Sequence, residues 1–182
     1  MTDTVDSATA TGSIHPPKPP VVADERTMLD AWLDLHRDIL IWKCEGLSPD
    51  ELVRRSAEPS SLSLIGLVRH MAEVERGWFR RVLTPEDGVE TLYDYSESED
   101  AELDNVDPAR VEEDFATYRT EVEACREVAA RYDLEDTGIS GRGNAVSLRW
   151  IYIHMIEEYA RHNGHADLLR ERIDGATGDW PQ

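Results

Sequence analysis

Four segments with helical periodicity limit the folds that this chain can adopt. Apolar residues recur every three or four positions over residues 24–45, 62–83, 108–132 and 147–174. This spacing puts the apolar side chains on one face of each helix, and each face has to be buried against another element. Because strand signals are few, the four segments predict an all-α protein, and specifically an antiparallel four-helix bundle.

Residues that start and stop helices fall between these segments. Gly46 and Pro49 follow the first segment, and the pair Thr84-Pro85 follows the second. Asp107 is a suitable N-cap before Pro108, and proline is favoured in the first turn of a helix. These signals support four separate helices.

The remaining segments are predicted to be connections and an arm. Residues 85–106 carry many acidic side chains, which predicts a long solvated connection. Residues 133–146 contain three glycines and are interpreted as a loop, with a short hairpin as the alternative. Residues 1–23 are rich in Thr, Ser, Ala and Pro, so we expect a disordered or extended N-terminal arm. One helical domain would then span residues 24–182.

Composition argues against several classes of partner. The net charge of −19 disfavours nucleic acids and anionic membrane surfaces, because both are bound mainly through Lys and Arg. No apolar run is long enough to span a membrane, and the N-terminus lacks the basic-then-apolar pattern of a secretory signal. The two cysteines, Cys44 and Cys125, are far apart and form no disulfide framework. We therefore expect a cytoplasmic protein.

Three ionisable residues interrupt the apolar stripe of the fourth segment. Counted in alternating steps of three and four, the stripe reads Leu148, Ile151, Met155, Glu158, His162, His165 and Leu169. Burying ionisable groups is unfavourable unless they are paired or bound to a metal. Glu158 and His162 are four residues apart and lie on one side of the helix, so a single helix offers two ligands to one ion. The alternative is a buried Glu158–His162 ion pair.

A third ligand has to come from another helix, and two histidines compete for this role. His70 lies at the edge of the apolar face of the second segment, whereas His36 lies within the apolar stripe of the first. A single histidine on an apolar face is more often a hydrogen-bonded core residue than a ligand, and we favour that interpretation for His36. His70 is the better candidate.

The other ionisable and nucleophilic residues carry weaker signals. His165 extends the polar stripe as a ligand, as a hydrogen-bond partner or as a solvated residue at the end of the bundle. His154 lies off the stripe, which indicates a role outside the ligand set or at the surface. Glu75 projects into the apolar side of the second segment, where a residue of a neighbouring helix would pair with it. Neither cysteine has a base nearby in the pattern, and no nucleophile elbow supports a Ser–His–Asp triad.

Two segments of the sequence resemble the DinB-like superfamily. The sequence SLIGLVRHMAEVERGWF at residues 63–79 is similar to the second helix of its actinobacterial branch, long labelled a domain of unknown function. Residues 148–175 resemble the fourth helix of the same branch. The resemblance implies a DinB-like metalloenzyme fold in which His70, Glu158 and His162 bind one divalent metal ion. Many members have His at the position of Glu158, and the Glu here resembles the mycothiol-dependent maleylpyruvate isomerase.

The same resemblance implies thiol chemistry. Related enzymes use mycothiol or bacillithiol, and the metal holds the thiol as a thiolate that attacks a small electrophile. Zinc is the expected ion, while nickel, iron and manganese also suit His and Glu ligands. His165 stands where other members have Gln and is the candidate catalytic residue for moving protons.

The expected function is a metal-dependent S-transferase or isomerase that uses a mycothiol-type thiol. A metal-dependent hydrolase and a non-catalytic, stress-related metal-binding bundle are the alternatives. Such bundles also form homodimers, and no feature of the sequence tests that state.

Overall fold

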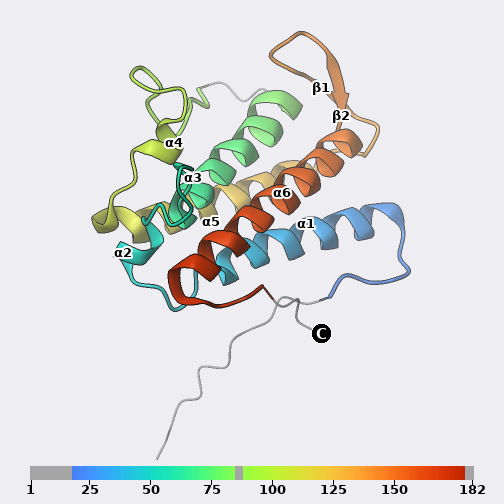
Figure 1. The fold of residues 1–182 in the computed structure, drawn as a ribbon. Helices are drawn as coiled ribbons and strands as arrows, with labels where there is room; N and C mark the ends of the chain where they lie inside the picture. Colours follow the sequence, from blue (N-terminus) through green and yellow to red (C-terminus); the bar gives the residue numbers. More distant parts are fainter. Residues whose placement is uncertain (1–17, 85–87, 179–182) are drawn as a thin grey trace, which may run out of the picture.

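Helices dominate the computed structural model, which describes residues 18–84 and 88–178 (Figure 1). The long helices are α1 (Glu25–Trp42), α3 (Leu64–Glu75), α5 (Val111–Ala129) and α6 (Leu148–Asp174), and a π-helical segment η1 (Arg76–Leu83) continues α3. The short elements are α2 (Pro49–Leu52), α4 (Ala101–Asp104), the 3-10 turn η2 (Pro108–Arg110) and the strands β1 (Thr137–Ile139) and β2 (Ala145–Ser147). Each segment with helical periodicity therefore contains one long helix.

The long helices pack in pairs around a common core. α1 lies mainly along α6 and α3 mainly along α5, while α3 also contacts α6 (Figure 1). Leu33, Met71, Cys125 and Met155 come from one long helix each and are buried in the same cluster. Burial of such side chains is the main favourable term in folding. The contact between α3 and α6 brings together the two helices that carry the candidate ligands.

Side-chain caps fix where the long helices begin. Asp24 accepts a hydrogen bond from the backbone of Thr27 at the start of α1, and Ser63 and Ser147 cap α3 and α6 in the same way. A cap of this kind satisfies a backbone N–H that has no partner within the helix. Gly175 ends α6 with a φ of +80°, a left-handed conformation that favours glycine.

The loop prediction for residues 133–146 is wrong, and the hairpin alternative is the structure that forms. β1 and β2 pair antiparallel, with Gly138 opposite Val146. Gly138 also lies against the end of η1, where an added Cβ would come within 1.9 Å of the carbonyl oxygen of Val82. The glycine therefore serves a close backbone contact between β1 and η1.

The acidic connection is only partly solvated, which corrects the prediction for residues 85–106. Ala101 and Glu102 of α4 are buried against α3, and residues 85–87 lie outside the described part. The predicted N-terminal arm falls mostly on residues 1–17, which also lie outside it, while residues 18–23 form no helix or strand. Within residues 18–84 and 88–178, no helix combines the length and apolarity that crossing a bilayer requires.

Candidate metal centre

The packing of α3 against α6 brings together the three residues predicted as metal ligands. One ligand atom each from His70, Glu158 and His162 lies within 4.8 Å of the other two. The rings of His70 and His162 are 4.8 Å apart between centroids, and Nε2 of His162 lies 3.5 Å from Oε2 of Glu158. Ligands on a tetrahedral zinc ion are about 3.4 Å apart, so side-chain shifts of about an ångström would complete such a site.

The stripe that led to Glu158 and His162 matches the buried face of α6 only in its apolar residues. From Met155 onward the buried residues are Tyr159, Asn163, Ala166 and Leu169. The side chains of Glu158 and His162 are 17% and 14% exposed and lie beside the core. Leu148, Ile151, Met155 and Leu169 of the predicted stripe are buried, whereas its three ionisable residues flank the face that α6 buries. Glu158 and His162 thus form the wall of a solvent-accessible site.

His162 is in the protonation state that a metal ligand needs. Burial, together with the neighbouring His70 and His165, lowers the pKa of His162 to about 4. At neutral pH the imidazole is therefore uncharged and keeps a lone pair on one nitrogen. Its Nδ1 faces Nδ1 of His165 at 3.4 Å, while its Nε2 faces Glu158.

His70 has a partner that sequence analysis missed. Nδ1 of His70 lies 3.0 Å from Oε1 of Glu102, and Glu102 is only 6% exposed. Glu102 belongs to the acidic run that was predicted to be solvated. In the sequence it resembles the other acidic residues of that run, so its contact with His70 was not predicted. A weak signal exists, because Ala101 and Leu103 are apolar residues on either side of Glu102 within that run.

His165 and His154 lie next to the ligands without joining the group of three. His165 contacts His162 from the side opposite Glu158, which favours its interpretation as a hydrogen-bond partner. Nε2 of His154 lies 3.7 Å from Oε1 of Glu158, and the His154 ring stacks on Trp150. This position agrees with the predicted role outside the ligand set.

A second group of ligand atoms shares Glu158 with the first. His154, Glu157 and Glu158 also lie within 4.8 Å of one another. Arg161 donates a hydrogen bond to Glu157, which is half exposed on α6. Arg161 also lies 3.8 Å from Glu158, so the two groups differ mainly in burial. Glu157 is exposed, whereas all three residues of the group with His70 are partly buried, which makes that group the better metal candidate.

Comparison with known families identifies the protein family. The sequence model of the mycothiol-S-transferases matches residues 28–175, a span that contains His70, Glu158 and His162. The chain belongs to the mycothiol-S-transferase family. This membership confirms the resemblance to the actinobacterial DinB-like branch. No curated protein and no solved structure matches the chain.

His36 lies away from the ligand group of this family member. Asn163 donates a hydrogen bond of 3.0 Å to the backbone oxygen of His36, and its amide is 3.3 Å from Nδ1 of the ring. Burial lowers the pKa of His36, so the imidazole is neutral. The structure thus agrees with the interpretation of His36 as a hydrogen-bonded core residue.

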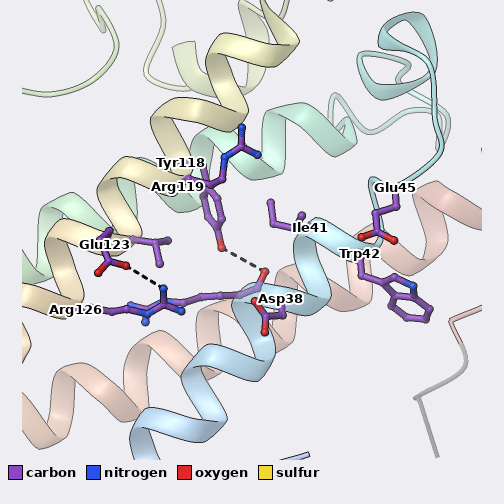
Figure 2. A pocket seen from close by; sticks show the side chains of 10 residues that line it. Asp38, Ile41, Trp42, Glu45, Tyr118, Arg119, Glu123 and Arg126 are labelled. Atoms are coloured by element: carbon purple, nitrogen blue, oxygen red, sulfur yellow. Dashed lines mark hydrogen bonds and ion pairs between the residues drawn. The ribbon is translucent and has the colours of Figure 1, made fainter. Parts of the chain in front are cut away.

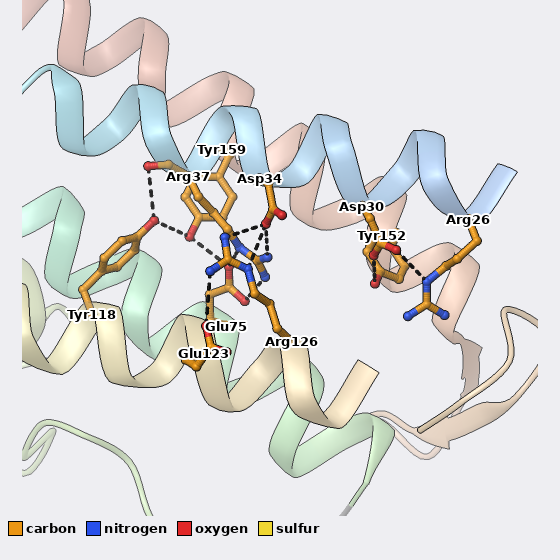
Figure 3. A network of polar contacts seen from close by, with 10 residues as sticks. All are labelled: Arg26, Asp30, Asp34, Arg37, Glu75, Tyr118, Glu123, Arg126, Tyr152 and Tyr159. Atoms are coloured by element: carbon orange, nitrogen blue, oxygen red, sulfur yellow. Dashed lines mark hydrogen bonds and ion pairs between the residues drawn. The ribbon is translucent and has the colours of Figure 1, made fainter. Parts of the chain in front are cut away.

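A buried polar network crosses the core between the long helices (Figure 3). Glu75 is fully buried and accepts two hydrogen bonds of 2.7 Å from Arg37 on α1. The hydroxyl of Tyr159 donates to Glu75 at 2.9 Å and lies 3.0 Å from the hydroxyl of Tyr118 on α5. The network joins all four long helices, and it confirms that Glu75 pairs with a neighbouring helix. Since Tyr159 follows Glu158 directly, the network also fixes the part of α6 that carries two candidate ligands.

A pocket of about 450 Å³ opens between α1 and α5 (Figure 2). Arg37, Asp38, Trp42, Tyr118 and Arg119 are among its lining residues, and none of the three candidate ligands is. Both positively and negatively charged side chains line it. The pocket is therefore separate from the candidate metal centre, and we assign it no role in the proposed chemistry.

The two cysteines are buried and are not suited to act as nucleophiles. Burial raises the pKa of Cys44 to about 12 and raises the pKa of Cys125 still further above its ordinary value. The thiolate is the reactive form, so both residues are almost entirely unreactive at neutral pH. The thiol of any transfer reaction has to come from a co-substrate.

We expect both thiols to react with a chromogenic disulfide reagent at pH 7.5 at least roughly 100-fold more slowly in the native protein than in urea. Unfolding returns each thiol to water and to a pKa of about 8.5, which restores the reactive thiolate. Stopped-flow absorbance measures both rates, and the Cys44→Ser and Cys125→Ser variants assign them. Rapid labelling of either residue in the folded protein would show that its thiol is accessible.

Proposed function

We propose that this protein is a metal-dependent S-transferase that joins a mycothiol-type thiol to a small electrophile. The observation that carries the proposal is the convergence of His70, Glu158 and His162 in a chain that matches the mycothiol-S-transferases over residues 28–175. The proposal includes a DinB-like antiparallel four-helix bundle made of α1, α3 with η1, α5 and α6. Residues 24–182 would form this single domain.

The three side chains fit a divalent cation. Two imidazoles and one carboxylate are a common ligand set for catalytic zinc, and they leave a coordination position for a substrate. Zinc is the preferred ion, and nickel, iron and manganese remain alternatives because they accept the same ligands. When bound, the cation would supply Lewis acidity that stabilises a thiolate at neutral pH.

The residues around the ligands support this chemistry. The neutral His162 needs no deprotonation before it binds a cation. In the reaction, the thiolate sulfur forms a bond to an electrophilic carbon, and the bond from that carbon to a leaving group breaks with its electron pair. His165 is the candidate to hold or move a proton, because it contacts His162 beside the site.

Turnover of mycothiol with a reactive halide tests the proposal directly. We expect zinc-loaded wild-type protein to consume the thiol and release halide, and we expect His162→Ala to lose this activity. Cys44→Ser is the control and should keep it, since Cys44 is buried and carries a protonated thiol at neutral pH. His165→Ala should retain more activity than His162→Ala if His165 only assists proton movement.

Other outcomes would favour the alternative functions. Tight zinc binding without turnover of halides, alkenes or epoxides would favour a non-catalytic metal-binding protein. Hydrolysis of an ester or amide without added thiol would favour a metal-dependent hydrolase. Return of the thiol with a rearranged substrate would favour an isomerase. A homodimer stays a prediction, and light scattering measures it.

A further inference from the structure

Glu102 connects the candidate ligand His70 to a buried polar cluster outside the group of three. Its Oε1 lies 3.0 Å from Nδ1 of His70, and its Oε2 is buried without a hydrogen-bond partner among the described residues. Placing an ionised carboxylate in such surroundings is unfavourable unless a strong donor compensates it. The ring N–H of His70 is a side-chain donor to this carboxylate, and the hydroxyl of Tyr95 also hydrogen-bonds Glu102.

A buried ion pair holds Glu102 in this position. Nε of Arg69 donates a hydrogen bond of 2.7 Å to the backbone oxygen of Glu102, and Nη1 donates one of 2.8 Å to Oδ1 of Asp114. Arg69 and Asp114 are both buried, and the guanidinium also lies 4.1 Å from the centre of the Tyr93 ring. Because Arg69 precedes His70 on α3, adjacent residues of one helix hold the backbone and the side chain of Glu102.

We propose that Glu102 is a positioning residue that makes His70 a metal ligand, and that the Arg69–Asp114 pair holds Glu102 in place. This inference rests on the proposed function, because it assumes that His70 binds the cation. A hydrogen bond from Nδ1–H to Glu102 selects the tautomer that carries its lone pair on Nε2, the nitrogen left for a cation. Carboxylates bound to metal-ligating histidines also fix the ring and raise its basicity, and their removal weakens metal binding about 10–100-fold.

Zinc affinity, measured by competition with a chromophoric chelator, tests the role of Glu102. We expect Glu102→Gln to bind zinc about 10-fold more weakly, because the amide oxygen still accepts the hydrogen bond without the charge. Glu102→Ala removes both the hydrogen bond and the charge, and its zinc affinity should be weaker than that of the wild type by about 100-fold. Glu99→Gln loses one charge from an exposed position in the same acidic run, and it should bind zinc as the wild type does.

The Arg69–Asp114 pair gives an independent arm of the test. Asp114→Asn weakens the ion pair without touching His70, and it should lower zinc affinity by less than Glu102→Ala does. The two effects should not add in the double variant, because both act through the same contact. Nitrogen NMR of labelled histidines reports the His70 tautomer, and the Nδ1–H signal of His70 should change in Glu102→Ala. The melting temperature of metal-free Glu102→Gln should equal that of the metal-free wild type.

The results separate this inference from the proposed function. Suppose that the wild type binds zinc and that Glu102→Gln and Glu102→Ala bind it with the same affinity and show the same His70 signal. This result would overturn the role of Glu102 and leave the proposed function standing. If Glu102→Ala does not fold, Glu102→Gln decides alone, since it keeps the shape of the side chain. A wild-type protein that binds no metal would overturn the proposed function, and this inference with it.

Discussion

Alanine at His162 or at Glu158 is expected to remove nearly all bound metal from the purified protein. Wild-type protein should carry about one divalent ion per chain, as one three-ligand site predicts. Loss of a direct ligand should weaken binding by more than the roughly 100-fold upper range for an outer hydrogen-bond partner. Elemental analysis after dialysis measures the metal content.

His36→Ala is the matched control for these variants. His36 is a partly buried histidine of the same protein, but its contacts are with Asn163 and not with the ligand group. This variant should keep about one ion per chain. Added metal should also raise the melting temperature of wild-type protein and of His36→Ala, since a ligand at 100 times its Kd stabilises the fold by about 2.7 kcal/mol. If wild type and the Glu158→Ala/His162→Ala double variant both lack metal and melt alike with added metal, the site does not exist.

Glu75→Ala is expected to destabilise the fold more than any surface substitution. It leaves the buried guanidinium of Arg37 without its bidentate partner and removes the acceptor for the Tyr159 hydroxyl. Breaking one side of a buried ion pair costs about 3–5 kcal/mol. For a chain of this size the loss corresponds to a fall in melting temperature on the order of 10 °C. Urea unfolding followed by circular dichroism gives the free energy of unfolding.

The exposed pair of Arg110 and Glu113 provides the comparison. Glu113→Ala breaks a contact of 2.9 Å between side chains that are more than half exposed, and such pairs contribute little to stability because water and salt screen them. A double variant with Arg37→Met and Glu75→Leu should recover much of the stability lost in Glu75→Ala, because no buried charge remains unpaired. Equal stability of Glu75→Ala and Glu113→Ala would show that the network of Figure 3 does not support the core.

The long helices could be predicted because their signals are local. The apolar period, the caps at Asp24, Ser63 and Ser147 and the stop at Gly175 all act within a few residues of chain. The same holds for Glu158 and His162, whose spacing of four residues alone puts them on one side of α6. The prediction that they lie within the buried stripe was wrong, since the core takes their neighbours Tyr159 and Asn163 and leaves Glu158 and His162 partly exposed at its edge.

The partners of these residues could not be predicted from local patterns. The hairpin of β1 and β2 forms around glycines that are equally typical of loops, and the close contact of Gly138 with η1 is a tertiary feature. The position of Glu75 on an apolar face predicted that it has a partner. The sequence did not identify that partner, because Arg37 lies 38 positions away in the chain. Glu102 looked like any other acidic residue of its segment.

The sequence by itself determined four amphipathic helices, the pair of candidate ligands on the last of them and, through family resemblance, the candidacy of His70. Only the tertiary structure decided that His70 lies close to Glu158 and His162, that His36 does not, and that Glu102 contacts His70. The physical reason is that helix formation and i, i+4 spacing depend on neighbouring residues. The composition of a site depends on which faces of distant helices come into contact, and that is set by the packing of the whole core.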